Sequence, residues 1–417
     1  MEEQLKIDFE KKLEDFSYSD QEKKFKETNF KEFLKQGFPN RKLENWKFSD
    51  LNQIIKSNIG ELTFYNDYKK ENQIDKIELI SELEHNKIII VDGKIEKIDF
   101  KFEDKDKIEV LVEQGEETIK ENINSLINLN NAFSNKFCKI IIKKNYSLKK
   151  PLAIYHSTNK NTKSKNTNSR IDFKLEENAC LRLIDIFKDN TEKNFLNIYY
   201  NFELDKSSIL KNYKIDKSIN NNVKYSYNHV KQEANSISET FILSSGSKFF
   251  KNEINCDLQG QHSSAFVNGI FDLDDENHHE IKSNINHLVE NTKSYQLVKS
   301  VLEKKSKAVY QGKIFVSSEA QKTDGYQLSN AILLSENSEF NAKPELEIYA
   351  DDVKCSHGSS SGSLDENSIF YLMSRGLNYK EAKKLLINGF LLDVIEKITD
   401  EEIKNLIKNL LGVKEWA

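Results

Sequence analysis

The chain has 417 residues, 37% of them hydrophobic and 31% charged, which is enough for two or three structural regions around a sizeable core. Its 62 Lys and Arg residues against 67 Asp and Glu residues give a formal net charge of -5, which argues against binding to the nucleic-acid backbone through a basic surface. No stretch approaches the roughly 18 to 20 apolar residues of a membrane-spanning helix, and the N-terminus lacks a signal-peptide pattern. We therefore expect a cytoplasmic protein that binds neither membranes nor nucleic acids.

Residues 1–84 are predicted to form an N-terminal helical region. Phe9 and Leu13 are spaced as on one face of a helix, and similar spacing continues as far as Gly37, which ends the pattern. Trp46, one of two tryptophans, lies in the segment that follows. We interpret Trp46 as an aromatic anchor between the helices and the core.

Residues 85–363 are predicted to form a β core. Short β-type runs such as 87–91 and 138–142 are separated by polar turns. A loosely repeated unit also recurs, in which an apolar run ends in leucine before an acidic or polar pair. The leucines of this unit are Leu175, Leu204, Leu243, Leu273, Leu302, Leu334 and Leu364.

These leucines recur at intervals of about 30 residues, once nearer 40, which is in the range typical of stacked structural repeats. In a parallel β-helix each coil buries its inward side chains against the coils above and below, so polar turns recur while outward residues vary. The repeats therefore predict a β-helix. A β-sandwich with similar turns is the alternative.

Residues 364–417 are predicted to form a C-terminal helical domain. A first helix would carry Ile369 on its apolar face and stop at Gly376. A second helix would begin near Lys380, and a third would begin near Thr399.

One histidine-rich segment contains common metal ligands. His278, His279 and Glu280, with His287 downstream, do not form an HExxH motif. We interpret them as solvated or turn positions, with a metal site as the alternative. The four cysteines of the chain form no CxxC pair, which favours reduced thiols over a disulfide framework.

The segment around Cys355 and His357 is the densest collection of reactive groups. Residues two apart project to the same side of a strand, where a thiol and an imidazole could both meet iron or another soft metal. The neighbouring Lys354 would lower the pKa of the Cys355 thiol and favour the thiolate. A purely structural role is the alternative, and no oxyanion donor can be identified for Cys-His nucleophilic catalysis.

Six runs carry a resemblance to a known family. In chain order they are 269–273 (GIFDL), 312–314 (GKI), 320–324 (AQKTD), 343–358 (KPELEIYADDVKCSHG), 370–377 (FYLMSRGL) and 385–390 (LLINGF). Together they resemble the C-terminal half of the SufD proteins of the SUF iron-sulfur cluster assembly system. The resemblance is strong over residues 265–392 and weaker at 37–51, whereas residues 60–260 rest on the repeat argument.

This resemblance implies a mainly β fold, with a right-handed parallel β-helix core flanked by N-terminal and C-terminal α-helical regions. It implies a non-catalytic scaffold subunit for iron-sulfur cluster assembly, in a complex with SufB, a homologous scaffold, and SufC, an ABC-type ATPase. No cofactor would be stably bound, and an iron-sulfur cluster would form transiently at the SufB interface. A homodimer is expected when SufB is absent.

The same resemblance assigns roles to individual residues. His357 would bind iron of the nascent cluster at the SufB interface, and Cys355 would be its weaker companion. ATP-driven dimerisation of SufC would shift the scaffold between two states and expose the assembly site. The SufC docking surface would contain Tyr371, Arg375, Leu386 and Phe390.

Three alternatives stay open. A SufB-like paralogous scaffold is one, although the KCSHG run after YADDV is similar to SufD. A stand-alone thiol or iron site protein that uses Cys355 and His357 is the second. A β-helix enzyme acting on carbohydrate is the third, but the adjacent Asp351 and Asp352 would lie on opposite faces of a strand and make a poor acid-base pair.

Overall fold

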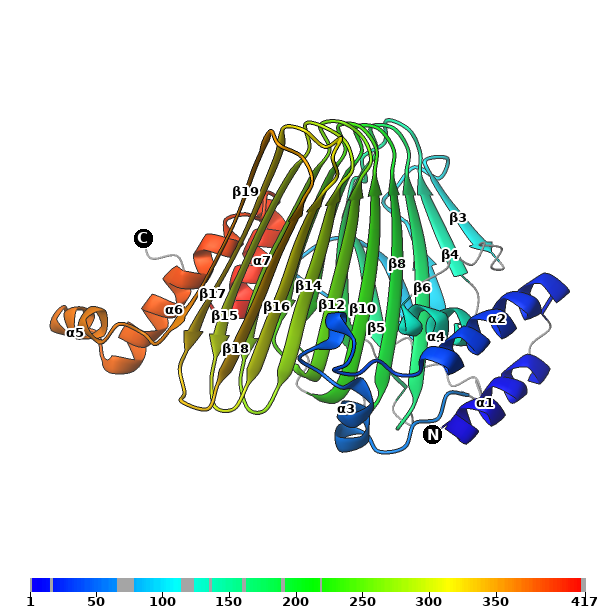
Figure 1. The fold of residues 1–417 in the computed structure, drawn as a ribbon, viewed down its shortest axis with the longest axis horizontal. Coiled ribbons are helices and arrows are strands. Elements are labelled where there is room, and N and C mark those ends of the chain that lie inside the picture. The colour runs from blue at the N-terminus through cyan, green and yellow to red at the C-terminus, as the bar shows by residue number, and fades with distance from the viewer. Residues whose placement is uncertain are drawn as a thin grey trace.

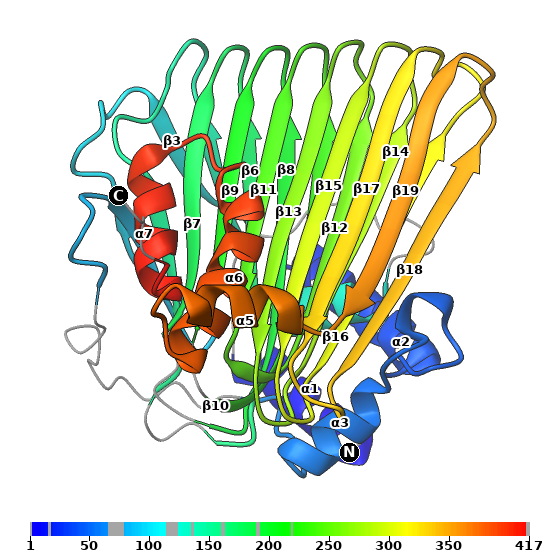
Figure 2. The same ribbon diagram turned by 90° about the vertical axis from the view of Figure 1, so that its left-hand side faces the viewer.

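The computed structural model describes residues 2–15, 18–65, 79–113, 124–134, 137–159, 163–188, 192–217 and 220–413. Its centre is a parallel β-solenoid of about seven turns, built from two long sheets (Figure 1). The described helices near the N-terminus lie against one sheet, and those near the C-terminus lie against the other (Figures 1 and 2). The predicted mainly β fold, a parallel β-helix flanked by helices, is confirmed.

From β4 onward, successive strands of the chain alternate between the two sheets. The ten-stranded sheet contains, in spatial order, β19 (Val353–Gly362), β17 (Thr323–Leu333), β15 (Lys293–Leu302), β13 (Ser264–Leu273), β11 (Ile237–Ser244), β9 (Ile209–Asp216), β7 (Cys180–Lys188), β5 (Leu152–Ser157), β1 (Asn86–Val91) and β2 (Lys94–Asp99). The nine-stranded sheet contains β18 (Glu339–Ile348), β16 (Lys307–Val316), β14 (His278–His287), β12 (Ser247–Leu258), β10 (Asn220–Gln232), β8 (Phe195–Leu204), β6 (Asn166–Leu175), β4 (Phe137–Ile142) and β3 (Ile108–Glu113). The strands predicted at 87–91 and 138–142 are β1 and β4.

From β4 and β5 onward, hydrogen-bonded neighbours in each sheet are parallel and one turn of the solenoid apart, whereas β2 pairs with β1 and β3 pairs with β4 in the antiparallel direction. Ser264 is in register with Lys293, and Lys293 is in register with Asp324. These steps of about 30 residues are the repeat that the leucines indicated.

The leucine series itself passes from one sheet to the other. Leu175 and Leu204 end β6 and β8 of the nine-stranded sheet, whereas Leu273 and Leu302 end β13 and β15 of the ten-stranded sheet. The longer interval before Leu243 therefore marks the change of sheet, because a step within one sheet takes a whole turn.

The space between the sheets, here called the lumen, is filled by a continuous cluster of buried apolar side chains that also contains two ion pairs. Lys214 in β9 lies 2.7 Å from Asp185 in β7, and Lys224 lies 3.0 Å from Asp216. Burial alone would raise the pKa of Asp185, but the nearby Lys214 ammonium and His156 hold it below its usual range. Because Asp185 and Lys214 are register partners, this pair joins two successive turns.

The N-terminal helices cover part of the nine-stranded sheet. They are α1 (Glu2–Asp15), α2 (Asp20–Gln36), the short 3-10 helix η1 (Glu44–Trp46), α3 (Leu51–Asn58) and the later α4 (Ser125–Phe133). Trp46 is 2% exposed, and its ring lies 5.8 Å from that of Tyr225 in β10. The predicted anchoring role of Trp46 is confirmed. Residues 1, 16–17 and 66–78 of the expected region 1–84 lie outside the described residues.

The C-terminal helices are α5 (Glu366–Ser374), α6 (Tyr379–Ile395) and α7 (Glu401–Leu411), close to their predicted starts. The Asp365 side chain accepts hydrogen bonds at the start of α5, and Asn378 and Glu381 form a capping box at the start of α6. Helices α6 and α7 bury apolar side chains against the outer face of the ten-stranded sheet (Figure 2). None of the described helices is long and apolar enough to cross a membrane.

The histidine-rich segment lies inside strand β14, so the prediction of solvated or turn positions is wrong. His279 and His287 are 0% exposed and Glu280 is 1% exposed. His279 points into the lumen and contacts the Ser244 hydroxyl, whereas the next residue, Glu280, points outward under the N-terminal cover. Within the described ranges, no group of His, Cys, Asp and Glu side chains is arranged to hold a metal ion.

The two lumenal histidines are expected to make the fold sensitive to acid. Burial lowers the pKa of His279 and of His287 to about 4, against 6.5 for an ordinary imidazole. Below about pH 6.5 the unfolded chain therefore takes up protons that the folded chain does not, and the unfolding free energy falls until about pH 4. We expect a loss of about 2 kcal/mol per histidine between pH 7 and pH 5, measured by urea denaturation at the two pH values.

Between pH 7 and pH 5, the unfolding free energy of the variant His287→Gln is expected to fall by about 2 kcal/mol less than that of the wild type. The matched control is His262→Asn, because His262 is exposed at a positive φ of 61° that asparagine tolerates. A pH dependence of His287→Gln equal to that of the wild type would contradict the assignment.

Candidate functional site

The last turn of the solenoid leaves one edge of each sheet without a strand partner in the described part of the chain. Strand β19 pairs with β17, and β18 pairs with β16, each on one side. Figure 2 shows both strands at one end of the solenoid. Backbone N–H and C=O groups on such edges can pair with a strand of another chain.

Cys355 and His357 lie on β19 and share its lumenal side, as their spacing predicts. Cys355 is in register with Gly325, and His357 is in register with Gln327. Cys355 is half-buried and packs against a small apolar cluster that includes Ile314, whereas His357 is exposed. The structure therefore brings a thiol and an imidazole together at the open end of the lumen.

The expected low pKa of Cys355 is wrong. Burial raises the pKa of the thiol above its usual value, and a backbone hydrogen bond with Gly325 offsets only part of this effect. Lys354 does not offset it because alternate residues of a strand point to opposite faces, so the ammonium lies on the outer side. The exposed His357 is thus the more accessible metal ligand of the two.

A buried row of polar side chains leads from His357 into the lumen. Gln327, one turn below His357, is 1% exposed and donates a hydrogen bond to the Glu345 carbonyl at 3.3 Å. The Tyr310 hydroxyl donates to Gln296 at 3.0 Å and lies 3.5 Å from Gln327. Burial raises the pKa of Tyr310, so its hydroxyl stays protonated and able to donate.

Gly312 is the sequence signal that could have revealed this row. A Cβ atom at Gly312 would collide with the side-chain oxygens of Gln327 and Tyr310. The glycine of the GKI run therefore makes room for the polar row, which the sequence analysis did not identify.

The predicted docking residues fall into two groups. Tyr371 and Arg375 are exposed on or next to α5, and the Arg375 guanidinium lies 5.2 Å from the Tyr371 ring centroid. Leu386 and Phe390 are half-buried in α6. The backbone carbonyl of Phe390 accepts a hydrogen bond from Lys299, so this residue holds α6 to the ten-stranded sheet.

Helix α5 and the start of α6 form an exposed apolar surface that the sequence analysis named only in part. Phe370 is 74% exposed, Tyr371 57%, Tyr379 52% and Met373 43%. Large apolar side chains grouped in this way are typical of a protein-protein contact surface. We call these four side chains the α5 surface.

The chain is similar in sequence to proteins of iron-sulfur cluster assembly. Residues 155–390 match the family model described as "SUF system FeS cluster assembly, SufBD core domain". The chain is 27% identical to the iron-sulfur cluster assembly protein SufD of Escherichia coli (strain K12), over 92% of this chain and 91% of that protein. It is 33% identical to SufD of Bacillus subtilis (strain 168), over 31% of this chain and 29% of that protein, and 29% identical to protein ABCI7, chloroplastic, of Arabidopsis thaliana, over 58% and 52%.

The substitution Gly312→Ala is expected to destabilise the protein by about 1 to 3 kcal/mol, because the added methyl group must displace Gln327 or Tyr310. Urea denaturation at neutral pH measures the change in unfolding free energy. The control is Gly389→Ala in α6, where a Cβ atom meets nothing within 4 Å and the higher helix propensity of alanine is expected to be neutral or stabilising. If Gly312→Ala were as stable as the wild type, the conclusion that Gly312 makes room for the polar row would be wrong.

Proposed function

Because the chain belongs to the SufBD family of SUF-system iron-sulfur cluster assembly proteins and is of the SufD type, we propose that it is a non-catalytic scaffold subunit. It joins a SufB-like scaffold and a SufC-like ABC-type ATPase in the cytoplasm. The observation that carries the proposal is the open end of the solenoid, where Cys355 and His357 lie beside an unpaired strand edge.

The open edges favour a partner with the same architecture. An isolated exposed edge is a liability that proteins normally cover. A homologous solenoid offers edges of the same strand spacing, so β18 and β19 can be extended by its strands. Such a partner would also close the lumen over Cys355 and His357, which places both side chains at the interface. When the SufB-like protein is absent, the same edges would pair with a second copy of this chain to form a homodimer.

The nascent iron-sulfur cluster is the cargo of this interface. A neutral imidazole is a good iron ligand, and His357 is exposed. Cys355 becomes a ligand only after losing its proton, which its raised pKa opposes until a metal ion binds. The partner's side chains would complete the ligand set, and the cluster would be passed on rather than retained.

The α5 surface is the docking site that we propose for the SufC-like ATPase. It lies on α5 and α6, and α6 is joined to β15 through Lys299, which contacts Phe390 and Asp393. Movement of an ATPase bound to α5 can therefore be transmitted to the solenoid. ATP-driven dimerisation would then bias the scaffold between two states, one of which opens the assembly site.

The first test is co-expression of this chain with the SufB-like and SufC-like proteins of the same genome, followed by native mass determination. A stable three-component complex is expected. A monomer that binds neither partner would contradict the scaffold role, and the alternative of a stand-alone thiol or iron site at Cys355 and His357 would then have to be tested.

The variant His357→Ala is expected to fold and join the complex, yet to yield little cluster, because an exposed ligand is lost without loss of packing. Iron and sulfide content after anaerobic reconstitution of the complex measures the effect. His262→Asn is the control, since His262 is also exposed but lies in a turn before β13, at a positive φ of 61° that asparagine tolerates. A wild-type cluster yield from His357→Ala would contradict the ligand role, and loss of folding would assign His357 to the structure.

The double variant Phe370→Ser, Tyr371→Ser is expected to weaken binding of the SufC-like ATPase at least tenfold, as truncation of aromatic contacts usually does. Both side chains are largely exposed, so the unfolding free energy should change little. Binding is measured by calorimetry with the purified ATPase. The control Ile7→Ser alters an exposed apolar side chain on α1 instead, and equal losses in both variants would remove the α5 surface as the docking site.

A further inference from the structure

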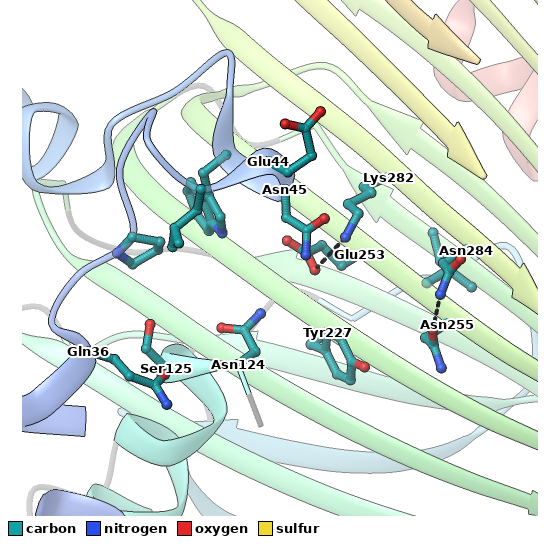
Figure 3. A pocket seen from close by; sticks show the side chains of 14 residues that line it. Gln36, Glu44, Asn45, Asn124, Ser125, Tyr227, Glu253, Asn255, Lys282 and Asn284 are labelled. Carbon is teal, nitrogen blue, oxygen red and sulfur yellow. Dashed lines mark hydrogen bonds and ion pairs between the residues drawn. The ribbon is translucent and has the colours of Figure 1, made fainter. Parts of the chain in front are cut away.

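A cavity of about 500 Å³ lies between the N-terminal cover and the outer face of the nine-stranded sheet (Figure 3). Its roof includes Pro39, Leu43 and Trp46, from the segment after α2. Its floor is made by strands β10, β12 and β14. This volume is in the range of about 300 to 1,000 Å³ that is usual for small-molecule sites.

The floor places an aromatic, an acidic and a basic residue in one row. Tyr227 is in register with Glu253, and Glu253 is in register with Lys282. Since neighbouring strands are about 4.8 Å apart, the three side chains stand next to one another on the outer face. Figure 3 shows Glu253 and Lys282 close together near Asn45.

Glu253 is buried close to the Tyr225 hydroxyl, without a full set of hydrogen bonds. The residue is 4% exposed, and its Oε1 atom has no hydrogen-bond partner among the described residues. The nearest ammonium groups are those of Lys282, 3.8 Å from Oε2, and Lys251, 4.0 Å from Oε1, which are too far for hydrogen bonds. An unsatisfied buried carboxylate oxygen is costly, so this position favours an incoming hydrogen-bond donor.

The two lysines are not equivalent. Lys251 is already committed, because it donates hydrogen bonds to the Asn45 carbonyl and to Glu280. The Lys282 ammonium makes no hydrogen bond to any described residue. It forms a loose ion pair with Glu253. Burial lowers the pKa of Lys282, and Glu253 opposes this only in part. The Lys282 ammonium therefore favours an incoming acceptor.

The charges on the floor balance, which restricts the ligand. Glu253 and Lys282 form one loose pair, and Lys251 and Glu280 form a tight one. A ligand with a net charge would leave one buried charge in excess. A ligand with one ammonium and one carboxylate would satisfy Glu253 and Lys282 at once and keep the floor neutral.

We propose that this cavity binds a free α-amino acid, with its ammonium on Glu253 and its carboxylate on Lys282. Both charged groups of an α-amino acid branch from one carbon, which matches two receptor groups 3.8 Å apart. The apolar roof then receives the amino-acid side chain, so binding would fasten the N-terminal cover to the sheet.

The first experiment is saturation-transfer NMR on the purified full chain with an equimolar mixture of the twenty proteinogenic L-amino acids. At least one amino acid is expected to show transfer and to protect the N-terminal cover from hydrogen exchange. Its methyl ester, which lacks the carboxylate charge, and its N-acetyl form, which lacks the ammonium, are expected to bind at least tenfold more weakly. Absence of transfer from the whole mixture would mean that the cavity holds only water and would overturn the proposal.

Two variants then locate the site. Glu253→Gln keeps the shape of the side chain and removes its charge, and Lys282→Met removes the ammonium. Each is expected to weaken binding roughly tenfold or more while circular dichroism stays unchanged. The matched controls are Glu177→Gln and Lys144→Met, which dismantle an exposed ion pair in the turns after β6 and β4, away from the cavity. Binding that survives both cavity variants, or that falls equally in the controls, would overturn the assignment.

Discussion

The hydrogen-bonded ladder between successive turns is the interaction on which the rest of this structure depends. Each strand from β4 and β5 onward pairs in parallel with the strand one turn away. A parallel ladder supplies hydrogen-bond partners for the backbone groups of every inner strand. The strands of the last turn have such partners on one side only. The same interaction that builds the solenoid therefore creates its open edge, and with it the surface on which assembly with other proteins is proposed.

The helices at the two ends of the chain cover apolar parts of the outer faces of the sheets. The sheets are apolar on parts of both outer faces as well as in the lumen, and separate sets of helices cover these parts. The N-terminal cover is held by Trp46 on Tyr225 and by Lys251, whereas α6 is held by apolar contacts and by Lys299. The α5 surface belongs to neither cover, since Phe370 and its neighbours face solvent. Its exposed side chains are thus available for a partner.

The sequence was sufficient where a residue's role follows from its spacing. The period near 30 residues predicts stacked turns, and the separation of Cys355 and His357 predicts a shared strand face. It failed where the role depends on what covers a face. The sequence pattern predicts that the charged Glu280 is solvated, but its partner Lys251 is covered by Asn45 and Trp46, more than 200 residues earlier in the chain. Cys355 likewise gains its raised pKa from packing that no neighbour in sequence reveals.

The Asp185–Lys214 pair has a consequence for how this solenoid can change during evolution. Coils with purely apolar interiors are interchangeable, so a chain built from them can lose or duplicate one and still stack. A coil with a buried charge has an obligatory neighbour, because deleting the coil of Lys214 would leave Asp185 in a dry interior without the ammonium that pairs with it. The coils that carry Asp185 and Lys214 are therefore expected to stay adjacent, whereas a coil without a buried charge has no such constraint.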